Sequence, residues 1–108
     1  MIELFSARSV KPYVNHLVLL ACIAEIDSMR YTPAGLPALN LQLQHESEID
    51  EAGQTRQVKA LVKAVAFGAV AERLTRQDVG SNWKFNGFLA TPGKGKHLVF
   101  HIQEFQQD

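Results

Sequence analysis

The sequence predicts a small all-β barrel or sandwich, built from five strands with one short helix between the third and fourth strands. The clearest signal is period-2 alternation, in which Leu39, Leu41 and Leu43 alternate with polar residues as in a half-buried strand. Glycine and proline clusters separate this segment from four other apolar segments of strand length. With 108 residues and 46% hydrophobic content, the chain is expected to form one domain with a packed core.

The first predicted strand lies at about residues 15–27, and residues 17–24 of it are apolar at nearly every position. Such a strand must be covered on both faces, and in a small barrel a partner subunit often supplies the second cover. We therefore expect a dimer. Residues 1–14 show no sustained period, so the predicted division is an N-terminal extension over 1–14 and one domain over 15–108.

The later elements follow from turn residues and periodicity. Pro33 and Gly35 fit a turn that leads into the second strand. Residues 69–74 favour helix, and a helix there would plug one end of a barrel. In chain order we predict a strand over 36–45, an acidic loop over 46–54, a strand over 55–67, the helix over 69–74, a strand over 82–90, a loop over 91–96 and a strand over 97–105.

Composition narrows the function classes. The 11 basic and 11 acidic residues give zero net charge, which argues against strong, indiscriminate nucleic-acid binding but permits a local basic face. No apolar run is long enough to cross a bilayer, and residues 1–14 lack the apolar core of a signal peptide. The lone Cys22 cannot form an internal disulfide and is expected to be a small buried side chain. These observations favour a cytoplasmic protein.

An enzyme is not expected. The four histidines do not show the Cys/His spacing of a zinc site, and no nucleophile-elbow or Ser/His/Asp pattern is present. The Gly93–His97 segment is basic and flexible but lacks the spacing of a phosphate-binding P-loop. We expect no metal and no cofactor.

Three motifs resemble the bacterial single-stranded-DNA-binding (SSB) family across about residues 15–105. They are the Arg30-Tyr31-x-Pro33-x-Gly35 turn, the Phe67-Gly68-x-x-Ala71-Glu72 segment and the strand from Gly80 to Leu89. Residues 51–53 and 86–88 are similar to the primosomal replication protein N (PriB) branch of that family. The resemblance implies an OB-fold barrel, which is a binding platform and seldom an enzyme scaffold.

Departures from the SSB pattern favour the PriB branch. The resemblance places Ile49 and Leu61 where SSB has base-stacking tryptophans, and the third such tryptophan falls in a loop that is shortened here. Lys59 stands where PriB proteins can carry a strand tryptophan, whereas the stacking phenylalanine of the family is kept as Phe67. Only Gln106-Gln107-Asp108 follow the last predicted strand, in place of the long SSB tail. These features imply a short dimeric accessory protein of replication restart.

The third strand carries the best candidate site. By parity, its even-numbered residues from Val58 to Ala66 face the interior, and the odd-numbered residues from Lys59 to Phe67 face outward. Lysines interleaved with apolar and aromatic groups suit phosphates and bases of a single strand. The alternative is an ordinary solvated face with Phe67 packed against the helix. The predicted single-stranded-DNA-binding residues are Arg30, Arg56, Lys59, Lys63, Phe67, Lys84, Lys94 and Lys96.

Two aromatic residues are assigned to the core and not to binding. Trp83 shares its parity with Phe85, and both fall where the family has core residues. The acidic residues between Glu46 and Glu51 are expected to repel phosphates.

The resemblance also implies partners. SSB-like proteins pair their first strand across a two-fold axis, and the residues predicted for that interface are Leu17, Leu19, Leu20, Ala21 and Ile23. The expected partners are single-stranded DNA, a second copy, the restart helicase PriA and other primosome proteins, without a membrane. The function implied is to stabilise that helicase on DNA at stalled forks, in the bacterial cytoplasm and at the nucleoid. Two alternatives stay open: a minor SSB-type coating protein, and an OB-fold protein–protein adaptor with negligible DNA affinity.

Overall fold

The computed structural model describes residues 13–108 and contains six strands and one helix within them. The predicted all-β class, with a short helix between the third and fourth long strands, is confirmed. In chain order the elements are β1 (Leu17–Ile26), β2 (Arg30–Tyr31), β3 (Pro37–Glu51), β4 (Gln54–Phe67), α2 (Ala69–Leu74), β5 (Asn82–Ala90) and β6 (Val99–Gln106).

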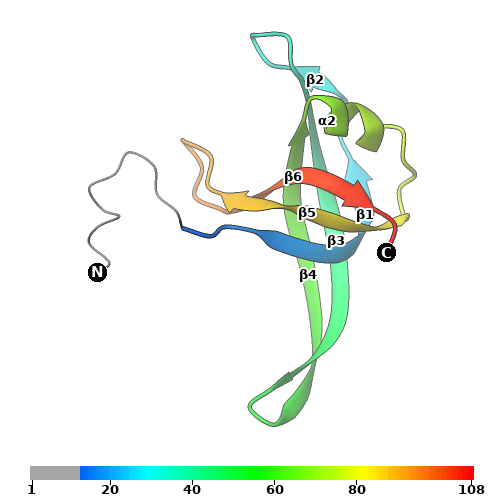
Figure 1. The fold of residues 1–108 in the computed structure, drawn as a ribbon, viewed down its shortest axis with the longest axis vertical. Coiled ribbons are helices and arrows are strands. Elements are labelled where there is room, and N and C mark those ends of the chain that lie inside the picture. Colours follow the sequence, from blue (N-terminus) through cyan, green and yellow to red (C-terminus); the bar gives the residue numbers. More distant parts are fainter. Residues whose placement is uncertain (1–12) are drawn as a thin grey trace.

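The five long strands close into a barrel, as Figure 1 shows. The sheet order is β1-β5-β6-β4-β3-β2, and β1 also pairs with β3. β1 serves two neighbours because its first half pairs with β5, while its second half, from Cys22 onward, pairs with β3. Closure on the other side is a short parallel contact in which Ala64 and Val65 of β4 meet β6. This topology is that of the OB fold.

The core follows the alternation read from the sequence. Leu39 and Leu43 are fully buried and Leu41 nearly so, whereas the intervening β3 residues lie on the outer side of the barrel. Phe85 and Phe100 fill the centre from β5 and β6. On β4, Val62, Ala64 and Ala66 face inward as predicted, whereas Val58 and Ala60, for which the same was predicted, are only half-buried.

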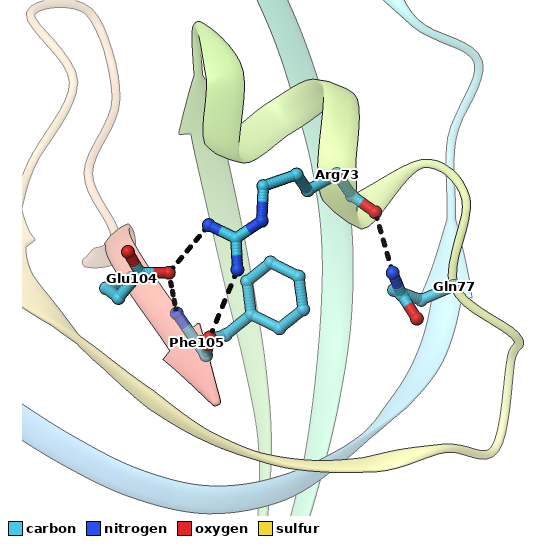
Figure 2. Close-up of polar contacts among 4 residues, drawn as sticks. All are labelled: Arg73, Gln77, Glu104 and Phe105. Atoms are coloured by element: carbon cyan, nitrogen blue, oxygen red, sulfur yellow. Dashed lines mark hydrogen bonds and ion pairs between the residues drawn. The ribbon is translucent and has the colours of Figure 1, made fainter. Parts of the chain in front are cut away.

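Helix α2 covers one end of the barrel with its buried Ala71 and Leu74. Figure 2 shows how Arg73 ties this helix to β6: its guanidinium donates to Glu104 Oε1 at 2.8 Å and lies 4.5 Å from the centroid of the Phe105 ring. The hydrogen bond from Arg73, helped by one from the Phe105 backbone N–H, lowers the pKa of Glu104 below its ordinary value.

The predicted acidic loop over 46–54 is wrong. β3 instead continues to Glu51, and with β4 it forms a hairpin arm, residues 45–60, that extends beyond the barrel in Figure 1. The turn needs only Ala52 and Gly53, which both adopt positive φ, at 53° and 78°. Two-residue turns of this kind match the twist of paired strands, so the polar segment is held in register by its partner strand.

Other boundaries differ by a few residues. The Arg30–Tyr31 turn forms a two-residue strand, β2, paired with β3. The last strand begins at Val99, so the loop before it covers residues 91–98. The predicted extension over 1–14 lies outside the described residues except for Tyr13 and Val14, which are exposed, and the domain division stays a prediction. Among residues 13–108, no helix has the length and apolar character needed to cross a membrane.

Candidate nucleic-acid interface

The outer sheet face of β3 and β4 presents the residues predicted to bind. Lys59, Leu61, Lys63 and Phe67 are exposed in a row along β4, whereas Val65 is covered. The neighbouring outer positions on β3 are polar: Asn40 lies opposite Val65, and Gln42 lies opposite Lys63. The parity prediction is thus confirmed, and the row combines cations with apolar and aromatic surface.

A basic groove crosses this row at Lys63. Its lining includes Arg30 from β2, Asn40 and Gln42 from β3, and Pro92 from the loop before β6. Arg30 is positioned by Asn40, whose Oδ1 accepts a hydrogen bond from its Nη2 at 3.1 Å. Glu25 and Asp27 also line this groove, which encloses about 410 Å³, so two carboxylates accompany its two cations. The excess positive charge on this side comes from Lys94 and Lys96 in the neighbouring loop. The structure therefore places two predicted cations, from elements far apart in the chain, in one groove.

The loop over residues 91–98 borders the basic groove through Pro92. A turn closed by the Gly95 N–H on the Pro92 carbonyl, at 2.9 Å, leaves Lys94 and Lys96 exposed. Its last residues, His97 and Leu98, lie beside Leu61 and Lys63. Both ends of the loop that carries the lysines thus lie on the same side of the barrel as Lys63.

Phe67 is not a core residue. Its side chain remains 38% exposed, and its ring stacks on His101 of β6 with centroids 6.0 Å apart. His101 in turn stacks on Phe88 of β5 at 4.7 Å. The sequence analysis missed His101 and Phe88, because strand parity indicates only that each points outward, not that three strands bring them together.

Three predicted binding residues lie away from the basic groove. Lys59 sits on the hairpin arm directly across from Glu46. Arg56 forms an ion pair with Glu51 at 2.6 Å near the tip of the arm, on the face opposite Lys59. Lys84 is half-buried on β5, opposite Leu20 of β1.

Strand β1 exposes a different set of side chains from the one predicted. Leu17 and Leu19 are half-buried, and Leu20 is exposed as an interface would require. Ala21 and Ile23 are a correction: both side chains are buried in the barrel core, so they are not available to a partner. Because β1 is apolar at nearly every position, its sequence shows no alternation of polar and apolar residues. The sequence therefore could not tell which of its side chains face the core and which face outward.

The outer side of β1 is formed instead by Val18 and Leu20, at 46% and 48% exposure, with half-buried Cys22 beyond them. The second edge of residues 17–21 has no strand partner among the described residues, because β3 joins β1 only at Cys22. His45 partly covers this edge by donating from Nδ1 to the Leu20 carbonyl at 2.6 Å. An apolar patch thus lies next to open backbone groups.

Within residues 13–108, no three side chains of metal-binding type come together. Trp83 packs edge-on against Phe105 at 5.0 Å, and Phe85 is fully buried, so both core assignments are confirmed.

The barrel, its short end helix and its mixed basic and aromatic outer face define an OB-fold protein of the single-strand-binding class. A family model described as "Another single-strand binding protein family" matches residues 15–104. The chain belongs to that family and, within it, to the replication restart PriB proteins.

Individual relatives agree with this assignment. Replication restart protein PriB of Bordetella pertussis is 45% identical over 92 residues, which cover 84% of this chain and 86% of that protein. The structure of PriB from Ralstonia solanacearum superposes with a TM-score of 0.81 at 38% identity, covering 88% of this chain and 98% of that one. The wild-type single-stranded DNA binding protein from Thermus aquaticus gives a TM-score of 0.70 at 25% identity, covering 86% of this chain and 49% of that one.

Proposed function

We propose that this protein binds single-stranded DNA on the outer sheet face of β3 and β4, without catalysing a reaction. The observation that carries the proposal is the basic groove, where Arg30 and Lys63 meet beside the loop that holds Lys94 and Lys96. Family membership supports it, because the matching family model is named for single-strand binding.

The cationic and the aromatic side chains of the site have different roles in binding. Ammonium and guanidinium groups in the groove contact phosphates, which gives affinity without sequence preference. The half-exposed ring of Phe67, further along β4, stacks on an unpaired base. A duplex keeps its bases stacked inside, so it can use the cations but not the ring. Binding is therefore expected to favour single strands.

Titration of fluorescein-labelled oligo-dT and of a duplex of equal length tests this proposal. We expect the single strand to bind more tightly at both low and physiological salt, with the difference retained as salt rises, because stacking is not screened. Equal or tighter binding of the duplex would contradict the platform.

We also propose that two copies pair through β1. The support is the exposed Val18 and Leu20 next to the open edge of residues 17–21. Antiparallel pairing of two such edges across a two-fold axis covers the apolar patch and completes the backbone hydrogen bonds of both strands. Lys84, opposite Leu20, would then lie at the margin of this interface and not in the DNA site.

Light scattering after gel filtration tests the dimer. Leu20→Asp is expected to produce monomers, because a charge would be buried at the centre of the interface. Val79→Asp is the matched control, since Val79 is also an exposed apolar residue but lies in the loop before β5. A monomeric wild type at micromolar concentration would sink the proposal.

For the role in the cell, we propose an accessory function in replication restart. A relative with 45% identity carries the name replication restart protein PriB. On this proposal the dimer, in the cytoplasm and at the nucleoid, holds the restart helicase PriA and other primosome proteins on single-stranded DNA at stalled forks. Tagged protein is expected to retain PriA in a pull-down and to lengthen its residence on a forked DNA. A plain coating protein would bind the DNA without retaining the helicase.

One observation favours a second candidate, an adaptor that binds proteins and has negligible DNA affinity. The outer side of the hairpin arm carries Glu46, Glu48 and Asp50, which repel phosphates, and the chain has zero net charge. The two functions separate in one experiment: the adaptor retains the helicase with or without DNA and shows no salt-dependent binding to oligo-dT.

A further inference from the structure

Three aromatic side chains form a continuous stack across the outer face of β4, β6 and β5. The His101 ring lies between Phe67, at 6.0 Å and an interplanar angle of 29°, and Phe88, at 4.7 Å and 15°. Offset-stacked aromatic pairs at such separations are mutually stabilising. His101 therefore backs the half-exposed ring of Phe67 and holds it in one orientation.

The backbone explains why these rings meet. β4 and β6 run parallel and pair only briefly, with Val65 opposite His101, which sets Phe67 diagonally beside the imidazole. On the other side β5 approaches β6 closely at Gly87, where a Cβ would collide with the His101 carbonyl. The pairing register shifts at Gly87 and places Phe88 directly opposite His101. The glycine thus brings the second phenylalanine onto the ring.

A shallow depression of about 360 Å³ lies beside the stack, and its volume is at the low end of ligand-binding pockets. Its lining is apolar and aromatic, with Gln103 as the one amide and no charged side chain: Val65, Phe67, Val70, Phe88, His101, Ile102 and Gln103. Both ring nitrogens of His45 are hydrogen bonded, whereas no hydrogen bond within residues 13–108 involves the imidazole of His101. The depression therefore offers flat rings and uncommitted polar groups.

We propose that His101 acts as the positioning residue of this depression: it fixes the Phe67 ring on which, by the proposed function, an unpaired base stacks, and the base then occupies the depression. The inference rests on the proposed single-strand binding and extends it from β4 onto β6 and β5. We take the occupant to be a nucleobase because the pocket adjoins Lys63, a proposed phosphate contact. Lys63 precedes Val65 of the pocket by two positions on the same face, about 7 Å away along the strand, so a phosphate on Lys63 delivers the adjoining base to the stack.

The test compares His101→Ala, which removes the supporting ring, with His101→Phe, which keeps a ring and loses the nitrogens. The probes are fluorescein-labelled oligo-dT for affinity and an oligo-dT carrying one 2-aminopurine, whose fluorescence falls when it stacks. We expect His101→Ala to weaken binding about 5- to 10-fold, at the low end of the loss of a stacked base, and to reduce the quenching of 2-aminopurine. His101→Phe is expected to behave as wild type.

Salt dependence separates this role from that of a phosphate contact. Because His101 supports a ring and contacts no phosphate in this proposal, removing the imidazole leaves the slope of log affinity against log salt unchanged, whereas Lys63→Ala lowers its magnitude by about 0.7. If His101→Ala binds oligo-dT and quenches 2-aminopurine as wild type does, the pocket is overturned. Weaker oligo-dT binding by Lys63→Ala in the same experiment would leave the proposed function intact. No single-strand binding by wild type would overturn both.

Three further outcomes are decisive. Loss of binding in His101→Phe with unchanged melting overturns the ring-stack account, because a ring is still present. If His101→Ala melts well below wild type, Phe88→Leu replaces it: reduced quenching supports the pocket, and wild-type quenching overturns it. A defect confined to helicase pull-down, with oligo-dT binding unchanged, would mean that a protein side chain occupies the depression, which also overturns the proposal.

Discussion

The charge pattern of the outer sheet face leads to a quantitative prediction for Lys63→Ala. Two predicted cations, Arg30 and Lys63, line the basic groove together with Glu25 and Asp27, and two more, Lys94 and Lys96, are exposed on the loop that borders it. Neither ion pair found within residues 13–108 involves any of these four cations. If each neutralises one phosphate, the slope of log affinity against log salt is about −3 per protomer, at about −0.7 for each contact.

The size of the effect follows directly. Between about 50 and 200 mM salt, wild-type affinity for oligo-dT should fall about 50-fold, and that of Lys63→Ala about 20-fold, because one counterion fewer is released. The assay is fluorescence anisotropy over a series of salt concentrations, with melting temperature as the check on folding. The salt series removes contributions from stacking, which do not change the slope.

Arg56→Ala is the matched control for this prediction. Arg56 is also a strand cation of β4, but it is paired with Glu51 and lies on the other face of the hairpin arm, so the slope should not change. A wild-type slope shallower than about −1 would refute the count of phosphate contacts. An equal change of slope in Arg56→Ala and Lys63→Ala would refute the location of the site.

The remaining predictions concern stacking, the sheet and the helix. Phe67→Ala should cost about 1–3 kcal/mol of oligo-dT binding by titration, with little change in melting, because the ring is already 38% exposed. Gly87→Ala should lower the free energy of unfolding in urea by about 3 kcal/mol, since the added Cβ meets the rigid His101 backbone. Glu104→Gln should lower stability by about 0.2–1 kcal/mol at neutral pH, as expected for an exposed pair with Arg73. The folded protein lowers the pKa of Glu104, so this difference is fully present above the ordinary glutamate pKa and disappears as the pH falls through the lowered one; urea unfolding at the two extremes checks the sign.

The fold was predictable from local patterns to a large degree. Alternation of Leu39, Leu41 and Leu43 identified the face of β3 that enters the core, and the same parity rule separated the two faces of β4. The failures share one physical cause, which is that the deciding interaction lies far away in sequence. Residues 46–51 look like an acidic loop until pairing with β4 makes them a strand.

The candidate site was predictable only in part for the same reason. β1 is apolar on both faces, so only its neighbours decide that Ile23 enters the core while Leu20 stays outside. The meeting of Arg30 with Lys63, and of Phe67 with His101, depends on the closure of the barrel. The residue types make each of these four side chains a candidate on its own, but no spacing in the sequence predicts that they come into contact.

The arrangement of charge also indicates where a bound strand runs. On the outer sheet face, the part near the barrel carries the basic groove, whereas the hairpin arm presents Glu46 opposite Lys59 and Glu48 opposite Gln57. A phosphate chain that followed β3 and β4 out along the arm would meet increasing negative charge and lose the attraction gained at Lys63. A chain that instead followed β4 away from the arm would pass Lys63, which shares its groove with Glu25 and Asp27, and would reach Phe67, whose pocket lining contains no carboxylate. Electrostatics and stacking therefore favour the same path, along β4 and away from the arm.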